Sequence, residues 1–160
     1  MMGGVVRVGD TLSFPWAEHN IRCDPEAASV VFRAGWPITV VGLDVTLQVT
    51  IRREHLQALK AHDSALNRAL VDQLDRYLGY RKRDFTYLHD PLAVAVAIDP
   101  SLVRLVPMHV EVETQGELTC GATVATLPLE GDPQRQANAE VAVAVDADRF
   151  RQFFFGRLGA

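Results

Sequence analysis

A histidine and a carboxylate stand side by side in the segment Leu88-His89-Asp90-Pro91. Asp90 suits the N-cap of a helix and Pro91 suits its first position, so ordinary helix capping accounts for these two residues. Capping gives no reason for His89. A site that moves a proton beside a cation uses both groups, the imidazole as proton donor and the carboxylate as an oxygen ligand. Taken alone, this segment favours helix capping over a functional site.

Further motifs become informative when they are taken in order along the chain. They are Met2-Gly3-Gly4, Ala17-Glu18-His19-Asn20-Ile21, Asp24-Pro25-Glu26-Ala27-Ala28, the run from Pro37 to Thr46, and Leu88-His89-Asp90-Pro91. Each motif by itself is weak. Together they resemble the C-terminal half of an inosine/uridine-preferring nucleoside hydrolase, and the resemblance runs from Met2 to about Phe154.

The resemblance implies a chemistry and a role for several residues. In this family water cleaves an N-ribosyl bond, while a calcium ion holds the ribose hydroxyls and the attacking water. Glu18 and Asn20 match the ribose-binding residues of the family's A-E-F-N motif, in which side chains two positions apart on an extended loop can face the sugar. His19 replaces the family's Phe, and a structural role is expected for it. His89 matches a position near the base, where an imidazolium donates a proton to the leaving group, and Asp90 matches a calcium ligand.

Two departures from the family pattern concern the polar groups. The family has Gly-Asn shortly before A-E-F-N, whereas this chain has Gly9-Asp10 at a longer spacing; Asp10 is either a substitute sugar ligand or a turn residue, and the turn is favoured. The family's N-terminal calcium motif, D-x-D-x-x-x-D-D, has no counterpart, because Asp146-Ala147-Asp148 suits the cap of a final helix. Calcium takes about six to eight oxygen ligands. This chain alone is therefore expected to bind calcium weakly and to be inactive or weak as a hydrolase.

Three functions remain open at this point. The chain is half of a nucleoside hydrolase, a non-catalytic ribose-binding or interaction remnant of that family, or a calcium-independent glycosidase that uses Glu18 and His89. The third is the weakest, because no second carboxylate is evident to activate water. The expected small-molecule partner is a nucleoside or ribose, which the resemblance links to purine and pyrimidine salvage. The expected protein partner is a second copy or a complementing N-terminal half, since the strand Val5–Val8 otherwise has a bare edge.

The patterning predicts an α/β fold that forms one domain over residues 1–160. We expect part of a doubly wound, mostly parallel sheet with flanking helices, then a small C-terminal β-hairpin-like segment and a closing helix. Expected strands are Val5–Val8, Ile38–Leu43, and two alternating stretches around Val110–Thr114 and Val141–Val145. Expected helices are Asp24–Gly35, Arg52–Ala61, Asp63–Gly79, Pro91–Ile98 and about 148–158. Expected loops are Gly9–Cys23 and Tyr80–Leu88. The leucines at 66, 70, 74 and 78 are interpreted as core packing.

Composition limits the classes of partner. Sixteen basic residues against twenty acidic ones give a net charge of −4, which argues against a protein that grips nucleic acid through its phosphates. The apolar run Pro91–Ile98 is too short to cross a bilayer, and the N-terminus has no secretory signal pattern. Cys23 and Cys120 match no metal or redox spacing, and small core positions in a reducing cytoplasm are expected for them. We therefore expect a cytoplasmic protein without nucleic-acid or membrane partners.

Overall fold

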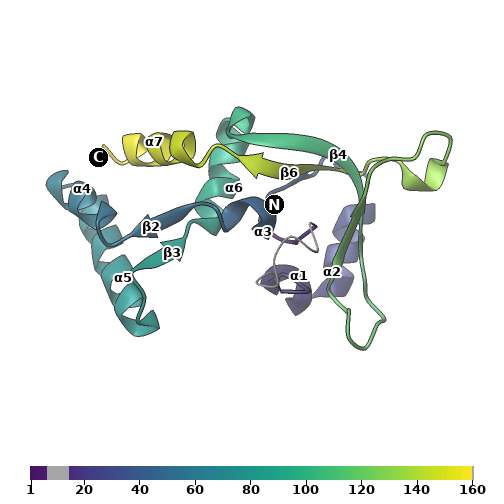
Figure 1. The fold of residues 1–160 in the computed structure, drawn as a ribbon, viewed down its shortest axis with the longest axis horizontal. Helices are drawn as coiled ribbons and strands as arrows, with labels where there is room; N and C mark the ends of the chain where they lie inside the picture. The colour runs from purple at the N-terminus through teal and green to yellow at the C-terminus, as the bar shows by residue number, and fades with distance from the viewer. Residues whose placement is uncertain (7–14, 160) are drawn as a thin grey trace. The chain divides into compact units, whose positions relative to one another are not determined.

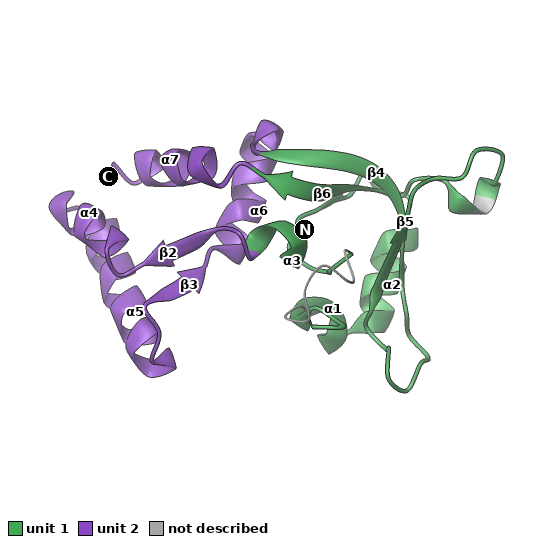
Figure 2. Cartoon of the chain, in the orientation of Figure 1, with its two compact units in different colours: residues 1–46, 103–145 green, residues 47–102, 146–160 purple. Residues whose placement is uncertain are grey.

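The computed structural model describes residues 1–6 and 15–159. It divides into two compact units, shown in different colours in Figure 2. Unit 1 comprises Met1–Thr46 and Val103–Val145, and unit 2 comprises Leu47–Leu102 and Asp146–Ala160. Each unit contains both helices and strands (Figure 1), so the predicted α/β class is confirmed. The single domain over residues 1–160 stays a prediction.

A four-stranded sheet, in the order β1-β6-β4-β5, forms the centre of unit 1. Its strands are β1 (Thr39–Val40), β4 (Val103–Val112), β5 (Thr123–Thr126) and β6 (Ala139–Val145). β1 runs parallel to β6, while β4 is antiparallel to both β6 and β5, so the sheet is mixed. The alternating valines that predicted two late strands lie in β4 and β6. β5 was not predicted from the sequence.

In the described part of unit 1, three α-helices and the short 3-10 helix η2 (Pro133–Arg135) accompany this sheet. The α-helices are α1 (His19–Cys23), α2 (Pro25–Arg33) and α3 (Leu43–Thr46). α2 begins as predicted, because the Asp24 side chain accepts a hydrogen bond from the Ala27 amide at 2.9 Å and Pro25 occupies the first turn. α2 lies against β4, and the core between helices and sheet is apolar. Its buried residues are Ile21, Phe32, Val40, Val110, Val112, Ala139, Val141 and Val143.

The N-terminal part of unit 1 differs from the predicted elements. The predicted loop Gly9–Cys23 is wrong at its end, where α1 forms. The predicted strand Ile38–Leu43 is reduced to β1, because the chain turns into α3 at Leu43, whose amide donates to the Gly4 carbonyl at 2.9 Å. Of the predicted strand Val5–Val8, Val5 is buried as expected, but residues 1–6 form only an isolated parallel bridge, Met2 with Val41. Arg7 and Val8 of this strand, and residues 9–14 of the predicted loop, lie outside the described residues.

Unit 2 is mainly helical, with a two-stranded antiparallel sheet. Its elements are β2 (Thr50–Arg52), α4 (His55–Ala61), α5 (Ala65–Arg81), β3 (Phe85–Tyr87), α6 (His89–Ile98), η1 (Pro100–Leu102) and α7 (Ala147–Arg157). β2 pairs with β3, so the predicted helix start at Arg52 and the predicted loop Tyr80–Leu88 are both wrong in part. The strands form because Ile51 pairs with Thr86, a contact that local patterning does not reveal.

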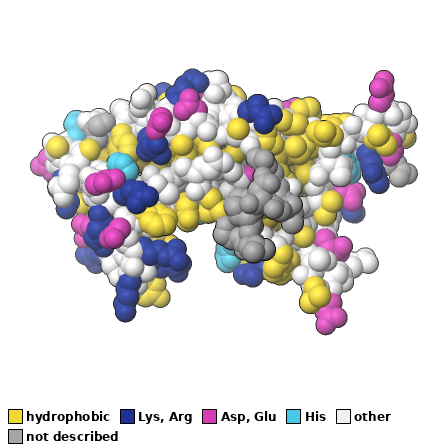
Figure 3. All heavy atoms as spheres, in the orientation of Figure 1, with side chains coloured by type: hydrophobic (Ala, Val, Ile, Leu, Met, Phe, Trp, Pro, Cys, Tyr) yellow, Lys and Arg dark blue, Asp and Glu magenta, His cyan; other side chains and the backbone are white. Residues whose placement is uncertain are grey.

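The regular spacing of the leucines in α5 is not what determines its buried face. Leu78 is buried, but Leu66 is 58% exposed, so the core assignment is wrong for Leu66. A spacing of four residues advances about 40° beyond one full turn of an α-helix, so the leucine row drifts around the helix. The buried face instead includes Asn67, Val71 and Leu78. Charged side chains of both signs lie over this helix in Figure 3. On α5, Arg76 Nε lies 3.0 Å from Asp72 Oδ1.

The expectations about a membrane span and about the two cysteines can be compared with the structure. Within residues 1–6 and 15–159, the helices are all too short or too polar to cross a membrane. Both cysteines are free, and Cys120 is half-buried, but Cys23 is exposed. The core assignment is therefore wrong for Cys23, because it lies at the exposed end of the short helix α1.

Candidate functional site

Glu18 is a buried carboxylate held by three backbone amides. It is the N-cap of α1 and only 3% exposed. Its Oε2 atom accepts hydrogen bonds from the amides of Gly4 at 3.2 Å, Asn20 at 2.9 Å and Ile21 at 3.2 Å. No donor from the described part of the chain reaches the other oxygen, Oε1. The side chain therefore has one oxygen fixed by the fold and a second that can accept from a ligand.

Asn20 lies beside Glu18, but not on the extended loop that the sequence predicted. Glu18 has extended backbone angles (φ −71°, ψ 149°), and Asn20 follows in the first turn of α1. The exposed Asn20 side chain donates through Nδ2 to the Met2 carbonyl at 3.3 Å, and Nδ2 is 3.4 Å from Met2 Sδ. The structure thus brings these two predicted site residues together at the segment Met1–Val6.

This segment is held by three buried side chains that accept from three consecutive backbone amides. The Gly4 amide donates to Glu18, the Val5 amide to Thr123 Oγ1 at 2.9 Å, and the Val6 amide to Asp44 Oδ2 at 3.0 Å. Buried backbone donors need partners, and here side chains replace the neighbouring strand of a sheet. Sequence reasoning missed both Thr123 and Asp44. The signal for Asp44 is an acid inside an apolar run; Thr123 gives no signal, because 118 residues separate it from Val5.

His89 and Asp90 belong to unit 2 and occupy the first turn of α6. The N-cap is Leu88, which makes no side-chain capping bond, so the predicted capping role of Asp90 is wrong. Asp90 is exposed, in a first turn where negative charge is favourable. His89 is half-buried, and its ring centroid is 5.4 Å from that of Tyr87 at an interplanar angle of 43°. Helix capping therefore no longer explains this motif.

Asp90 is the one calcium ligand that the sequence predicts, while Asp10 is expected to be a sugar ligand or turn residue and Asp146 a helix cap. Asp10 lies outside the described part of the chain. Asp146 caps α7, as predicted, by accepting from the Arg149 amide at 3.0 Å. In residues 1–6 and 15–159, no three His, Cys, Asp or Glu side chains come together as a group that could hold a metal ion. Because calcium takes about six to eight oxygens, the described residues do not fit this ion by themselves.

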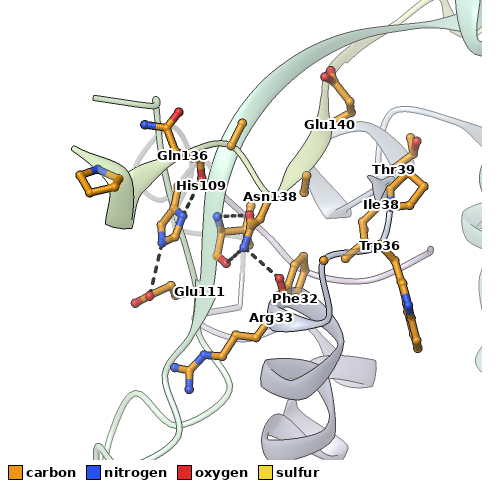
Figure 4. Close-up of a pocket in the computed structure, with 16 residues that line it drawn as sticks. Phe32, Arg33, Trp36, Ile38, Thr39, His109, Glu111, Gln136, Asn138 and Glu140 are labelled. Carbon is orange, nitrogen blue, oxygen red and sulfur yellow. Dashed lines mark hydrogen bonds and ion pairs between the residues drawn. The ribbon is translucent and has the colours of Figure 1, made fainter. Parts of the chain in front are cut away.

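A cavity of about 750 Å³ in unit 1 contains none of the predicted site residues (Figure 4). Its polar groups are largely used by the fold. Asn138 exchanges hydrogen bonds with the backbone of Val110 at 2.7 and 2.9 Å, and His109 lies between the Gln136 carbonyl at 2.9 Å and Glu111 Oε1 at 3.3 Å. These contacts join β4 to the chain leading into β6, so we assign them a structural role.

Comparisons with known proteins agree on one family. The model of the family described as inosine-uridine preferring nucleoside hydrolase matches residues 1–152. The non-specific ribonucleoside hydrolase RihC of Salmonella enteritidis is 42% identical over 156 residues, which cover 96% of this chain and 48% of that protein. The structure resembles a purine-preferring ribonucleoside hydrolase from Gardnerella vaginalis (TM-score 0.83, 36% identity, 98% of this chain and 50% of that chain). It also resembles a plant nucleoside hydrolase (TM-score 0.85, 33% identity, 99% and 52%). The chain thus spans about half the length of these relatives.

Proposed function

Because the chain belongs to the inosine-uridine preferring nucleoside hydrolase family, we propose that it supplies ribose-binding and base-protonating groups for hydrolysis of the N-glycosidic bond of a ribonucleoside. Glu18 and Asn20 bind ribose, and His89 donates a proton to the departing base. Asp90 contributes one carboxylate to a calcium site, and Asp10 remains a candidate sugar ligand.

The geometry of Glu18 carries this proposal. Its carboxylate is buried and oriented by three amides at 2.9 to 3.2 Å, while no described donor reaches Oε1. A buried acceptor with a fixed direction suits a sugar hydroxyl, which donates one hydrogen bond. A carboxylate also suits a ribose that becomes positively charged as the bond to the base breaks. Asn20, two residues after Glu18, adds a side-chain amide that can bind the same sugar.

His89 suits general acid catalysis because the departing base of a nucleoside leaves poorly as an anion. Protonation by a positioned imidazolium removes that charge. His89 lies at the first position of α6, next to the Tyr87 ring.

We propose that turnover needs polypeptide equivalent to the rest of the family enzyme. The match covers 48% of the Salmonella enteritidis relative, and the described residues lack a group of three metal-binding side chains. The lack of such a metal-binding group also favours a second candidate function, a ribose-binding module without catalysis. A second copy or a complementing N-terminal half are the protein partners we propose, in a cytoplasmic setting.

An assay of the chain with inosine and uridine in the presence of calcium tests these proposals. The chain is measured alone and after mixing with a separately produced N-terminal half of a family enzyme, with Glu18→Ala as the inactive control. Hydrolysis only in the mixture supports the proposed function. Robust hydrolysis by the chain alone contradicts the need for further polypeptide. Ribose binding without hydrolysis in the mixture favours the module, and absence of both contradicts the ribose site.

A further inference from the structure

We propose that Thr123 is a positioning residue that holds the Glu18 carboxylate in place through the backbone of Gly4 and Val5. This inference rests on the proposed role of Glu18 in ribose binding. Thr123 lies in β5, far from Glu18 in the sequence, and is only 3% exposed. Both residues belong to unit 1.

The Thr123 hydroxyl acts on Val5 in both directions. It accepts a hydrogen bond from the Val5 amide at 2.9 Å and donates one to the Val5 carbonyl at 2.8 Å. A hydroxyl has one hydrogen to donate and lone pairs to accept, so a single side chain satisfies both polar groups of one residue. This pairing fixes the position and rotation of Val5, as a neighbouring strand does in a sheet.

Gly4 transmits this constraint to Glu18. Its amide donates to Glu18 Oε2 at 3.2 Å, and its carbonyl accepts from the Leu43 amide at 2.9 Å. Gly4 has φ +82°, in a region that favours glycine. A Cβ atom at Gly4 would lie 3.3 Å from Thr123 Oγ1 and Cγ2. Thr123 therefore packs directly on the residue that binds the carboxylate.

The structure predicts that the amides bound to Glu18, those of Gly4, Asn20 and Ile21, lose protection from hydrogen exchange when the Thr123 hydroxyl is removed. Thr123→Val keeps the β-branched shape but removes both hydrogen bonds to Val5. Gly4 then moves more freely, and Oε2 of Glu18 loses a fixed donor. The amides that Glu18 holds at the start of α1, those of Asn20 and Ile21, should open more often, although neither contacts Thr123 through a hydrogen bond.

Amide hydrogen exchange followed by NMR on the full chain tests this coupling. In Thr123→Val the exchange of Gly4, Asn20 and Ile21 should accelerate about tenfold, the effect of one lost hydrogen bond. Thr123→Ser, which keeps the hydroxyl, should restore protection. Thr126→Val, an exposed position of the same strand, should change none of them. Acceleration confined to Val5 would overturn the proposal, because Thr123 would then stabilise only its own contact.

Two further measurements test the same role of Thr123 independently of this exchange experiment. If Thr123→Val does not fold, amide exchange is measured instead in the wild-type chain at increasing urea concentration. Val5, Gly4 and Asn20 exchanging through one opening reaction, with the same dependence on urea, supports the proposal. Three separate opening reactions refute it. Ribose binding is measured by titration calorimetry for wild type, Thr123→Val, Glu18→Gln and the double variant. Thr123→Val should weaken ribose about fivefold to tenfold, and have no further effect with Glu18→Gln. Equal weakening in both backgrounds overturns the positioning role. No ribose binding by wild type, alone or mixed with the N-terminal half, contradicts the proposed function, while the exchange result still decides whether Thr123 holds Glu18.

Discussion

The carboxylate of Glu18 accepts a hydrogen bond from the backbone amide of Asn20 at 2.9 Å. The two residues to which we assign ribose binding are therefore fixed with respect to each other. Glu18 caps the helix on which Asn20 lies, and the Asn20 side chain reaches back to the Met2 carbonyl. Capping and the proposed sugar binding are thus combined in one carboxylate, so a substitution of Glu18 affects both stability and ligand binding.

Glu18→Ala should lower the free energy of unfolding by about 1–3 kcal/mol, because it removes a helix cap and leaves buried amides without an acceptor. Glu18→Gln keeps one oxygen acceptor and should cost less. Urea unfolding followed by circular dichroism measures both. Glu26→Ala, an exposed acid in the first turn of α2, serves as control and should stay within about 0.5 kcal/mol of wild type. A Glu18→Ala chain as stable as this control would contradict the capping role.

His89→Ala should slow the hydrolysis of purine nucleosides by at least about a hundredfold in the complemented enzyme, since the base must then leave without a proton from the protein. Steady-state assays with inosine measure the change in kcat. A His62→Ala variant alters an exposed histidine of the same unit and should retain wild-type rates. An unchanged rate in His89→Ala would remove this residue from the role of general acid.

The chain alone should bind calcium with a Kd weaker than about 1 mM, because the described residues offer no group of three metal-binding side chains. Titration calorimetry with calcium chloride measures this affinity. In the complemented enzyme the affinity should rise, and Asp90→Asn should lower it again. Tight binding by the solitary chain, unaffected by Asp90→Asn, would show that the ligands lie elsewhere.

The carboxyl group of Asp99 should make part of the stability of unit 2 dependent on pH. The hydroxyl of Ser101, followed by its amide and the Arg149 guanidinium, holds the pKa of Asp99 below its ordinary value of 3.8. Because the folded pKa is depressed, the stabilisation is present above the ordinary pKa and is lost as the pH falls through the folded pKa. Ser101→Ala should raise the pKa of Asp99 in a carboxyl NMR titration. The pKa of Glu113, lowered by the amides of Gln115 and Gly116, should not change. A constant Asp99 pKa would contradict the role of Ser101.

The starts of two helices were predictable because capping is local. Asp24 accepts from Ala27 and Asp146 from Arg149, each three residues later. A short polar side chain before a helix determines such a contact without help from distant residues. Capping failed at Asp90, because α6 begins at His89. The residue pair His89-Asp90 had to be recognised from its similarity to a family motif.

The strands that were missed depend on distant partners. β3 lies in a segment that is polar enough to suggest a loop, but it forms because it pairs with β2. β5 forms beside β4 after the turn around Gly116 to Ala122. A three- or four-residue strand has little signal of its own, since its stability comes from cross-strand neighbours.

By itself, the sequence determined the family, the α/β class, two helix caps, and Glu18, Asn20, His89 and Asp90 as the residues to examine. Only the tertiary structure decided how Glu18 is held, since Gly4, Asn20 and Ile21 converge on one of its oxygens. It also decided that Thr123 supports Val5 from 118 residues away. The physical reason is that motifs record residue types along the chain, whereas a buried carboxylate is oriented by donors that meet only after the chain has folded.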